Sequence, residues 1–267
     1  MNNITTILCD LVNLYLLSPQ NAEEIKSFRG YGFHGSLSIG DDQELNRLAP
    51  DDFAVSKILV SKRNLVELAA YLDELKARTS LIFPSTSVSP ETRTLLSNLG
   101  FIPSSIPKAA AFVLPLGRVN FSNRESGPVA LIRRISHDEV LRHSRAMAEW
   151  YGFSSVRSVH IIFANTAPVG NLMNDVYMAF DPLTGLPLGY SRLCMSPCNK
   201  VGYCGGAAIA SSARRKGIYL ELIKARILGA QNAGMKSIGT FASQNGASGA
   251  YAKLGFQKIA EVDFFSR

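Results

Sequence analysis

A short motif recurs in the two halves of the chain and limits how such a chain can fold. The tripeptide Leu99-Gly100-Phe101 returns as Leu254-Gly255-Phe256, at an offset of 155 residues. The same offset lays a helix expected from residue 64 onto one expected from residue 217, so strand, helix, strand, helix and Leu-Gly-Phe follow in order twice. We therefore expect two similar domains, although a helix that ends in glycine and an aromatic residue is also a common cap.

The spacing of apolar residues predicts alternating helices and strands. Helices are expected at residues 6–17, 22–28, 64–78, 90–99, 136–151, 217–233 and 247–254. Strands are expected at residues 52–60, 80–83, 109–116, 129–134, 174–180, 188–195, 201–210, 237–242 and 257–265. Residues 120–128 are polar and rich in turn-forming residues, so we expect the linker between the domains there. The expected domains are residues 1–126 and 127–267. We expect an α/β fold, with a mixed, mostly antiparallel sheet and flanking helices.

Charge is distributed unevenly between the halves. The 267-residue chain carries a net charge of +7, but residues 1–128 carry −1 and residues 129–267 carry +8. A basic excess of this size favours an anionic partner, such as nucleic acid, a membrane surface or a phosphorylated small molecule. The apolar stretch at residues 7–17 contains Asp10 and Asn13 and follows no basic residue, so it fits neither a signal peptide nor a membrane span. We expect a cytoplasmic protein with no membrane partner.

The cysteines and glycines exclude other classes of site. Four cysteines are too few for a disulfide framework. Cys194, Cys198 and Cys204 lack the paired spacing of a zinc site, so we expect small buried thiols and no metal. The stretch Gly30 to Gly35 fits Gly-x-Gly-x-x-Gly, but no buried strand precedes it and no helix follows, so it does not predict a dinucleotide site.

A basic loop between a strand and a helix is the strongest candidate site. Arg214, Arg215 and Lys216 follow the strand expected at residues 201–210, and Gly217 allows a tight turn into the next helix. Backbone N–H groups at a helix start converge, and the helix dipole adds positive potential. The loop is therefore suited to a pyrophosphate, although a solvated basic turn would have the same composition.

This loop resembles a signature of the GNAT superfamily of N-acetyltransferases. The acyl-CoA-binding motif of that superfamily reads Arg/Gln-x-x-Gly-x-Gly/Ala, and Arg214, Gly217 and Tyr219 occupy its defined positions. Tyr219 departs from the motif, because it adds bulk where the family has glycine or alanine.

A second signature follows at the family's usual separation. It reads Asn-x-x-Ala-x-x-x-Tyr-x-Lys-x-Gly-Phe and is matched by Ala247, Tyr251, Lys253, Gly255 and Phe256. The Asn position falls on Gln244, with Asn245 one residue later. The two signatures cover residues 201–265, and a weaker resemblance reaches back to residue 129.

The resemblance implies a tandem GNAT-like fold whose second half binds acetyl-CoA as co-substrate. In the family, the strand before the basic loop pairs with the pantetheine arm, which assigns that role to Ala207, Ala208 and Ile209. The loop and helix start hold the pyrophosphate, which assigns that role to Arg214, Arg215, Lys216, Gly217, Ile218 and Tyr219. Gln244 and Asn245 complete the implied cofactor-binding set.

The resemblance also implies a mechanism of N-acetyl transfer. A primary amine attacks the thioester directly in a ternary complex, and Tyr251 donates a proton or hydrogen bond to the departing thiolate. Tyr251 could instead be an aromatic residue of the core. The general base stays open, because the strand at 201–206 has no carboxylate. The candidates are Glu149, Asp175 and Asp181 through a water, and His160 directly.

Several alternatives remain open at this stage. The acceptor is an unidentified amine, and acetyl is only the commonest acyl group of the family. A catalytically inactive CoA-binding or interaction scaffold is the alternative function, and a homodimer stays open. A nucleic-acid partner is disfavoured, because the aromatic residues are not interleaved with the basic ones. The first half resembles a degenerate GNAT-like copy, since only Ser61-Lys62-Arg63 separate its expected strand and helix.

Overall fold

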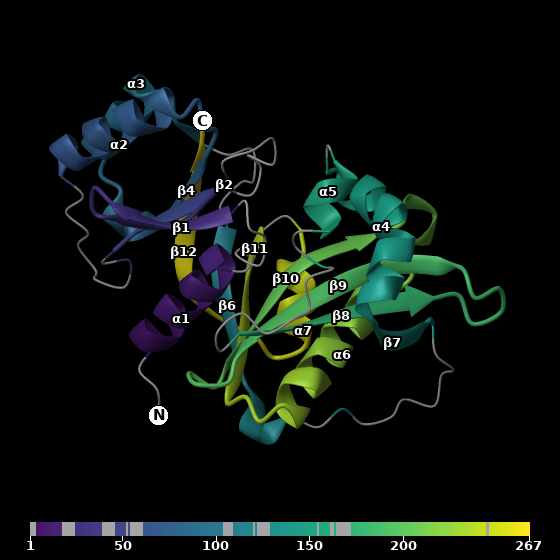
Figure 1. Ribbon diagram of the computed structural model, residues 1–267. Helices are drawn as coiled ribbons and strands as arrows, with labels where there is room; N and C mark the ends of the chain where they lie inside the picture. The colour runs from purple at the N-terminus through teal and green to yellow at the C-terminus, as the bar shows by residue number, and fades with distance from the viewer. Residues whose placement is uncertain are drawn as a thin grey trace. The chain divides into compact units, whose positions relative to one another are not determined.

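The computed structural model is a mixed α/β fold in which most strand pairs are antiparallel (Figure 1). It describes residues 4–17, 25–38, 46–51, 53, 61–103, 109–119, 121, 129–153, 155–160, 163, 172–243 and 246–267. One compact unit comprises Met1–Phe112, Phe241–Ser248 and Lys258–Arg267, and the other comprises Val113–Thr240 and Gly249–Gln257. The fold class is confirmed, and the sequence boundary at residue 126 stays a prediction.

The first unit contains a small sheet with helices on its faces. Its elements are α1 (Ile4–Leu17), β1 (Ile25–Gly30), β2 (Phe33–Ser38), β3 (Arg47–Pro50), α2 (Lys62–Glu74), β4 (Ser80–Pro84), α3 (Pro90–Asn98), β5 (Ile102–Pro103) and most of β12 (Gln257–Ser266). The strand order is β1-β2-β3-β4-β12, and β3 and β4 are the parallel pair, joined through α2. Strand β6 (Ala109–Pro115) begins in this unit and ends in the second.

The two faces of this sheet carry separate apolar cores. Side chains alternate across a strand, so Leu81 and Phe83 pack with α2 and α3 while Ile82 points to the opposite face. There Ile82 packs with Leu8, Val12 and Leu16 of α1. In Figure 1, α1 and the α2–α3 pair accordingly lie on opposite sides of these strands.

The second unit repeats this arrangement on a larger scale. Its elements are β7 (Leu131–Ile135), α4 (His137–Tyr151), α5 (Val156–Val159), β8 (Met173–Phe180), β9 (Pro187–Ser196), β10 (Val201–Ile209), α6 (Ile218–Asn232), most of β11 (Ser237–Ser243) and α7 (Ser248–Lys253). The strand order is β11-β10-β9-β8-β7, and β10 and β11 are parallel neighbours joined through α6.

Helices α4 and α6 lie on opposite faces of these strands. The Tyr190 hydroxyl of β9 donates to the Met147 carbonyl of α4 at 3.2 Å. Leu193 lies three residues further along β9, so its side chain points to the opposite face of the sheet. On that face it lies close to Gly229 of α6. Helix α4 begins with the expected capping box, because Ser136 accepts from the Glu139 N–H while Glu139 accepts from the Ser136 N–H.

The repeated Leu-Gly-Phe motif has the same conformation in both units. Gly100 and Gly255 have φ angles of 82° and 85°. The Phe101 N–H donates to Leu96 at 2.9 Å, and the Phe256 N–H donates to Tyr251 at 3.2 Å, the bond of a Schellman cap. Tyr251 therefore has Leu96 as its counterpart in the first unit.

One predicted element is wrong. The expected helix at 22–28 is replaced by strand β1, which pairs with β2 through a two-residue turn at Tyr31 and Gly32 with φ angles of 55° and 76°. Positive φ at both positions matches the twist of a hairpin and outweighs the weak helical pattern. The Gly-x-Gly-x-x-Gly stretch therefore forms a hairpin. Most of the strand expected at 52–60 and of the linker at 120–128 lies outside the described residues.

No helix among the described residues is long and apolar enough to cross a membrane.

We expect Gly255→Ala to lower the free energy of unfolding by about 1–2 kcal/mol, because an alanine side chain disfavours the left-handed backbone. Urea denaturation monitored by circular dichroism measures this change. Gly249→Ala in α7 is the matched control, since Gly249 has no positive φ and a Cβ there meets nothing within 4 Å. An equal loss in both variants would contradict the conformational explanation.

Candidate active site

Strand β10 separates from β11 partway along its length. The parallel pairing joins Val201–Tyr203 to Ser237–Gly239 and ends there. The antiparallel pairing with β9 continues as far as Ile209, with a register shift between Gly205 and Ala207. Among the described residues, the last part of β10 is therefore paired along one edge only, and a polar ligand can approach the other edge.

Two contacts define the point of separation. The Thr240 hydroxyl donates to the Cys204 carbonyl at 2.8 Å, which satisfies a backbone group at the point where the ladder ends. Gly206 follows with φ 54°, and a Cβ on it would lie 2.7 Å from Cζ of Phe163. Glycine is therefore required at the bulge for both conformation and space.

The basic loop comes directly after the unpaired part of β10. A short 3-10 turn, Ser211–Ala213, leads to Arg214, Arg215 and Lys216, which are all exposed. Gly217 has φ 81° and precedes α6 without a side-chain cap. The first N–H groups of α6 are thus oriented for an anion, with three cationic side chains nearby.

The predicted cofactor-binding residues differ in accessibility. Ala207 and Ile209 are half-buried on β10, and Ala208 is buried. Ile218 is buried, so only its backbone can contact a phosphate. Arg214 Nε donates to the Ile209 carbonyl at 3.3 Å, which links the loop to the end of β10. Gln244 and Asn245 lie outside the described residues.

Tyr251 lies in the interior of the second unit, 1% exposed. Its hydroxyl is 3.1 Å from the Tyr219 hydroxyl and accepts a hydrogen bond from Arg226 Nη2 at 3.3 Å. Burial raises the pKa of Tyr251 well above its ordinary value, and the charge of Arg226 opposes this shift. The structure therefore brings the tyrosines of the two signatures together, and it adds an arginine that the sequence analysis did not select.

The four candidate bases have different surroundings. Glu149 and His160 are exposed, on α4 and at the end of α5. Asp175 is 3.0 Å from Arg134 Nη1. Asp181 accepts from the Thr184 and Leu183 N–H groups, both at 2.9 Å, and these bonds lower its pKa. Asp181 thus has a structural role in the turn, and no candidate is singled out as the base.

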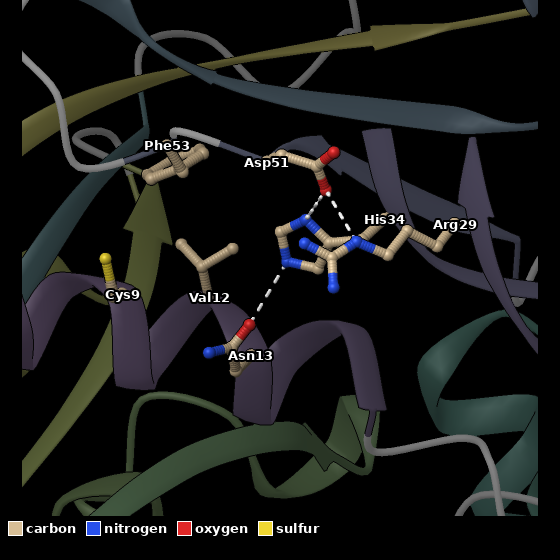
Figure 2. A pocket seen from close by; sticks show the side chains of 7 residues that line it. All are labelled: Cys9, Val12, Asn13, Arg29, His34, Asp51 and Phe53. Carbon is tan, nitrogen blue, oxygen red and sulfur yellow. Dashed lines mark hydrogen bonds and ion pairs between the residues drawn. The ribbon is translucent and has the colours of Figure 1, made fainter. Parts of the chain in front are cut away.

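A cavity of about 270 Å³ lies in the first unit (Figure 2). His34 of β2 bridges its two sides, with Nε2 3.1 Å from Asn13 Oδ1 and Nδ1 3.2 Å from Asp51 Oδ1. Arg29 Nε also approaches Asp51, at 3.7 Å. Burial lowers the pKa of His34 and Asp51 partly offsets this. Sequence reasoning did not predict this group, because its members come from α1, two strands and a turn.

The cysteine expectation holds for two of the three clustered residues. Cys194 and Cys204 are buried, and burial raises the pKa of Cys194 to about 11. Cys198 is exposed, because it lies in the turn between β9 and β10, so its predicted burial is wrong. Within the described ranges, no His, Cys, Asp and Glu side chains group in a way that could hold a metal.

No protein-family model and no curated protein matches the sequence. Solved structures do match the fold. A GCN5-related N-acetyltransferase from Kribbella flavida has a TM-score of 0.66 at 14% identity, with 95% of each chain covered. A tandem GNAT protein from the clavulanic acid biosynthesis pathway has a TM-score of 0.55 at 12% identity, over 83% of this chain and 74% of that one.

The structures with a similar fold include a protein that is not an acetyltransferase. The N-myristoyltransferase of Saccharomyces cerevisiae with bound myristoyl-CoA has a TM-score of 0.53 at 14% identity, over 82% of this chain and 62% of that one. At these identities the likeness shows the fold. The chain therefore has the GNAT acyltransferase fold, and the predicted tandem GNAT-like architecture is confirmed at that level.

We expect Thr240→Val to destabilise the protein by about 1–3 kcal/mol, because it removes the hydroxyl that pairs with the buried Cys204 carbonyl. Valine has nearly the same shape, so the loss reports the hydrogen bond. Thr240→Ser keeps the donor and is expected to cost only about 1 kcal/mol for the missing methyl group. Chemical denaturation compares the two, and an equal loss would show that the hydroxyl is not needed.

Proposed function

We propose that the protein is an N-acetyltransferase that moves an acetyl group from acetyl-CoA to a primary amine. The observation that carries this proposal is the continuity of two features within the second unit. The unpaired edge of β10 leads directly into the basic loop and the start of α6. An extended pantetheine arm and a pyrophosphate need these two features next to each other.

Each part of the site has a defined task in this proposal. Backbone groups of Ala207–Ile209 pair with the pantetheine arm as an added strand would. Arg214, Arg215 and Lys216, with the N–H groups that follow Gly217, bind the pyrophosphate. The bound thioester carbonyl then lies near the bulge, where a neutral amine attacks it directly without an acyl-enzyme.

In the first unit we infer a GNAT-like copy that has lost cofactor binding. Its α2 is capped by the Ser61 side chain, which accepts from the Asn64 N–H at 3.1 Å, rather than by a bare glycine. Asn64, where the sequence predicted the helix to begin, thus lies inside the first turn of α2. Leu96 takes the place of Tyr251, so this copy also lacks the phenol. We therefore propose acetyl-CoA binding for the second unit alone.

Calorimetric titration with acetyl-CoA and with CoA tests the cofactor site. We expect saturable binding of both, and a dissociation constant at least about tenfold higher when Arg214, Arg215 and Lys216 are replaced by alanine, since about 1.4 kcal/mol of lost phosphate contact suffices. The control replaces Lys62 and Arg63, the exposed basic residues at the start of α2. Absence of binding at millimolar CoA, or equal weakening by both variants, would contradict the site.

The burial of Tyr251 favours a second candidate function, a CoA-binding scaffold without transferase activity. The Tyr251 side chain is 1% exposed, which argues against direct contact between its hydroxyl and a leaving group. Release of CoA thiol in the presence of polyamines, amino acids, aminoglycosides and peptide amines separates the two functions. Amine-dependent release supports the enzyme, whereas tight CoA binding with no release for any amine supports the scaffold.

A further inference from the structure

Arg226 is a buried cation that the cofactor site does not explain. It lies on α6, 0% exposed, where Nε donates to the Leu222 carbonyl at 3.3 Å and Nη2 donates to Tyr251. Its Nη1 is buried without a hydrogen-bond partner in the described structure. No carboxylate of the described residues forms an ion pair with it. A buried charge in this state is costly, so a compensating role is expected.

The hydrogen bonds of Arg226 fix the direction of a chain of hydroxyl groups. A guanidinium only donates, so the Tyr251 oxygen accepts from Arg226. Within the described structure, the partners of the Tyr251 hydroxyl are Arg226 and Tyr219. The buried Tyr251 O–H therefore donates to the Tyr219 oxygen, since a buried donor without a partner is costly. Tyr219 is only half-buried, and its own proton is left to point to another acceptor.

This chain lies where β10 leaves β11. The charge of Arg226 acts on the thiol of Cys204, whose pKa burial raises and Arg226 lowers. Cys204 follows Tyr203, the last residue of β10 that pairs with β11. Its carbonyl accepts from the Thr240 hydroxyl just before the bulge. The guanidinium carbon also lies 5.9 Å from the centre of the Tyr219 ring. The side chains of Arg226, Cys204 and Tyr219 thus lie near the point at which an acyl-CoA would enter between β10 and β11.

We propose that Tyr219, rather than Tyr251, is the catalytic acid of the transfer, and that Tyr251 and Arg226 are positioning residues behind it. This inference rests on the proposed function. It also gives a role to Tyr219, whose bulk departs from the Gly or Ala of the family motif.

The proton transfers balance over one reaction. The acceptor nitrogen forms the new C–N bond and loses one proton to solvent. The C–S bond breaks, its electron pair goes to sulfur, and the Tyr219 proton passes to that sulfur. The Tyr251 proton follows to the Tyr219 oxygen, which leaves a phenolate on Tyr251 beside the Arg226 charge. One proton from solvent returns along the same chain and restores both phenols.

The test compares Tyr219→Phe with Tyr251→Phe at saturating acetyl-CoA and amine. We expect Tyr219→Phe to lower kcat about 100-fold, typical of a lost general acid, while the dissociation constant for acetyl-CoA changes less than about twofold. Tyr251→Phe leaves Tyr219 in place, so we expect a smaller loss, about tenfold.

Arg226 variants separate charge from packing. Arg226→Lys keeps the cation and is expected to retain most of the rate, whereas Arg226→Met, which fills the space without charge, is expected to lower kcat about as much as Tyr251→Phe. Thermal unfolding and acetyl-CoA titration confirm that each variant is folded and loaded.

The outcomes separate this inference from the proposed function. Wild-type kcat in Tyr219→Phe, or a larger loss in Tyr251→Phe than in Tyr219→Phe, would overturn the assignment of the acid while leaving the transferase intact. Equal rates for Arg226→Lys and Arg226→Met would overturn the role of the charge. Failure of the wild-type protein to bind acetyl-CoA or to acetylate any amine would instead contradict the proposed function.

Discussion

The end of the β10–β11 ladder is the constraint from which the candidate site follows. Parallel strands tend to continue pairing, because each unpaired backbone group in the interior costs free energy. Here the Thr240 hydroxyl satisfies the Cys204 carbonyl, and the left-handed Gly206 turns the chain away. The edge of β10 beyond this point is free of β11 in the described structure, while its other edge stays fixed to β9. A rigid strand with one available edge can bind an extended ligand through its backbone.

The same element order in the two units yields different helix starts. Both units place a helix between parallel strands, β3 and β4 in one and β10 and β11 in the other. In the first unit a serine side chain occupies an N–H group of α2, and in the second a left-handed glycine leaves the start of α6 without such a cap. The difference concerns only a few residues, and it leaves the first N–H groups of α6 available to an anion. Under the function we propose, acyl-CoA binding therefore belongs to the second unit.

Local signals in the sequence predicted most elements correctly. The capping pair Ser136 and Glu139 and the glycines that end α3 and α7 act over a few residues, so their patterns can be read directly. Strand β1 was missed, because its apolar residues are few and its conformation depends on pairing with β2. The contact between Tyr219, Tyr251 and Arg226 could not be predicted either. In the sequence, Arg226 has the spacing of an ordinary helical residue, and only the packing of α6 shows that it is buried.

The buried guanidinium of Arg226 lies beside the phenols of Tyr219 and Tyr251, so its charge affects the ionisation of any group that reacts there. Burial makes the phenolate of Tyr251 unfavourable, and it also makes the uncompensated charge of Arg226 unfavourable. Each cost falls when the other group is ionised, since opposite charges attract strongly where water is excluded. The charge of Arg226 therefore lowers the cost of a negative charge on Tyr251, while burial keeps the pKa of that phenol above its ordinary value. Under the mechanism we propose, thiolate departure creates a negative charge, and the hydroxyl chain carries that charge toward Arg226.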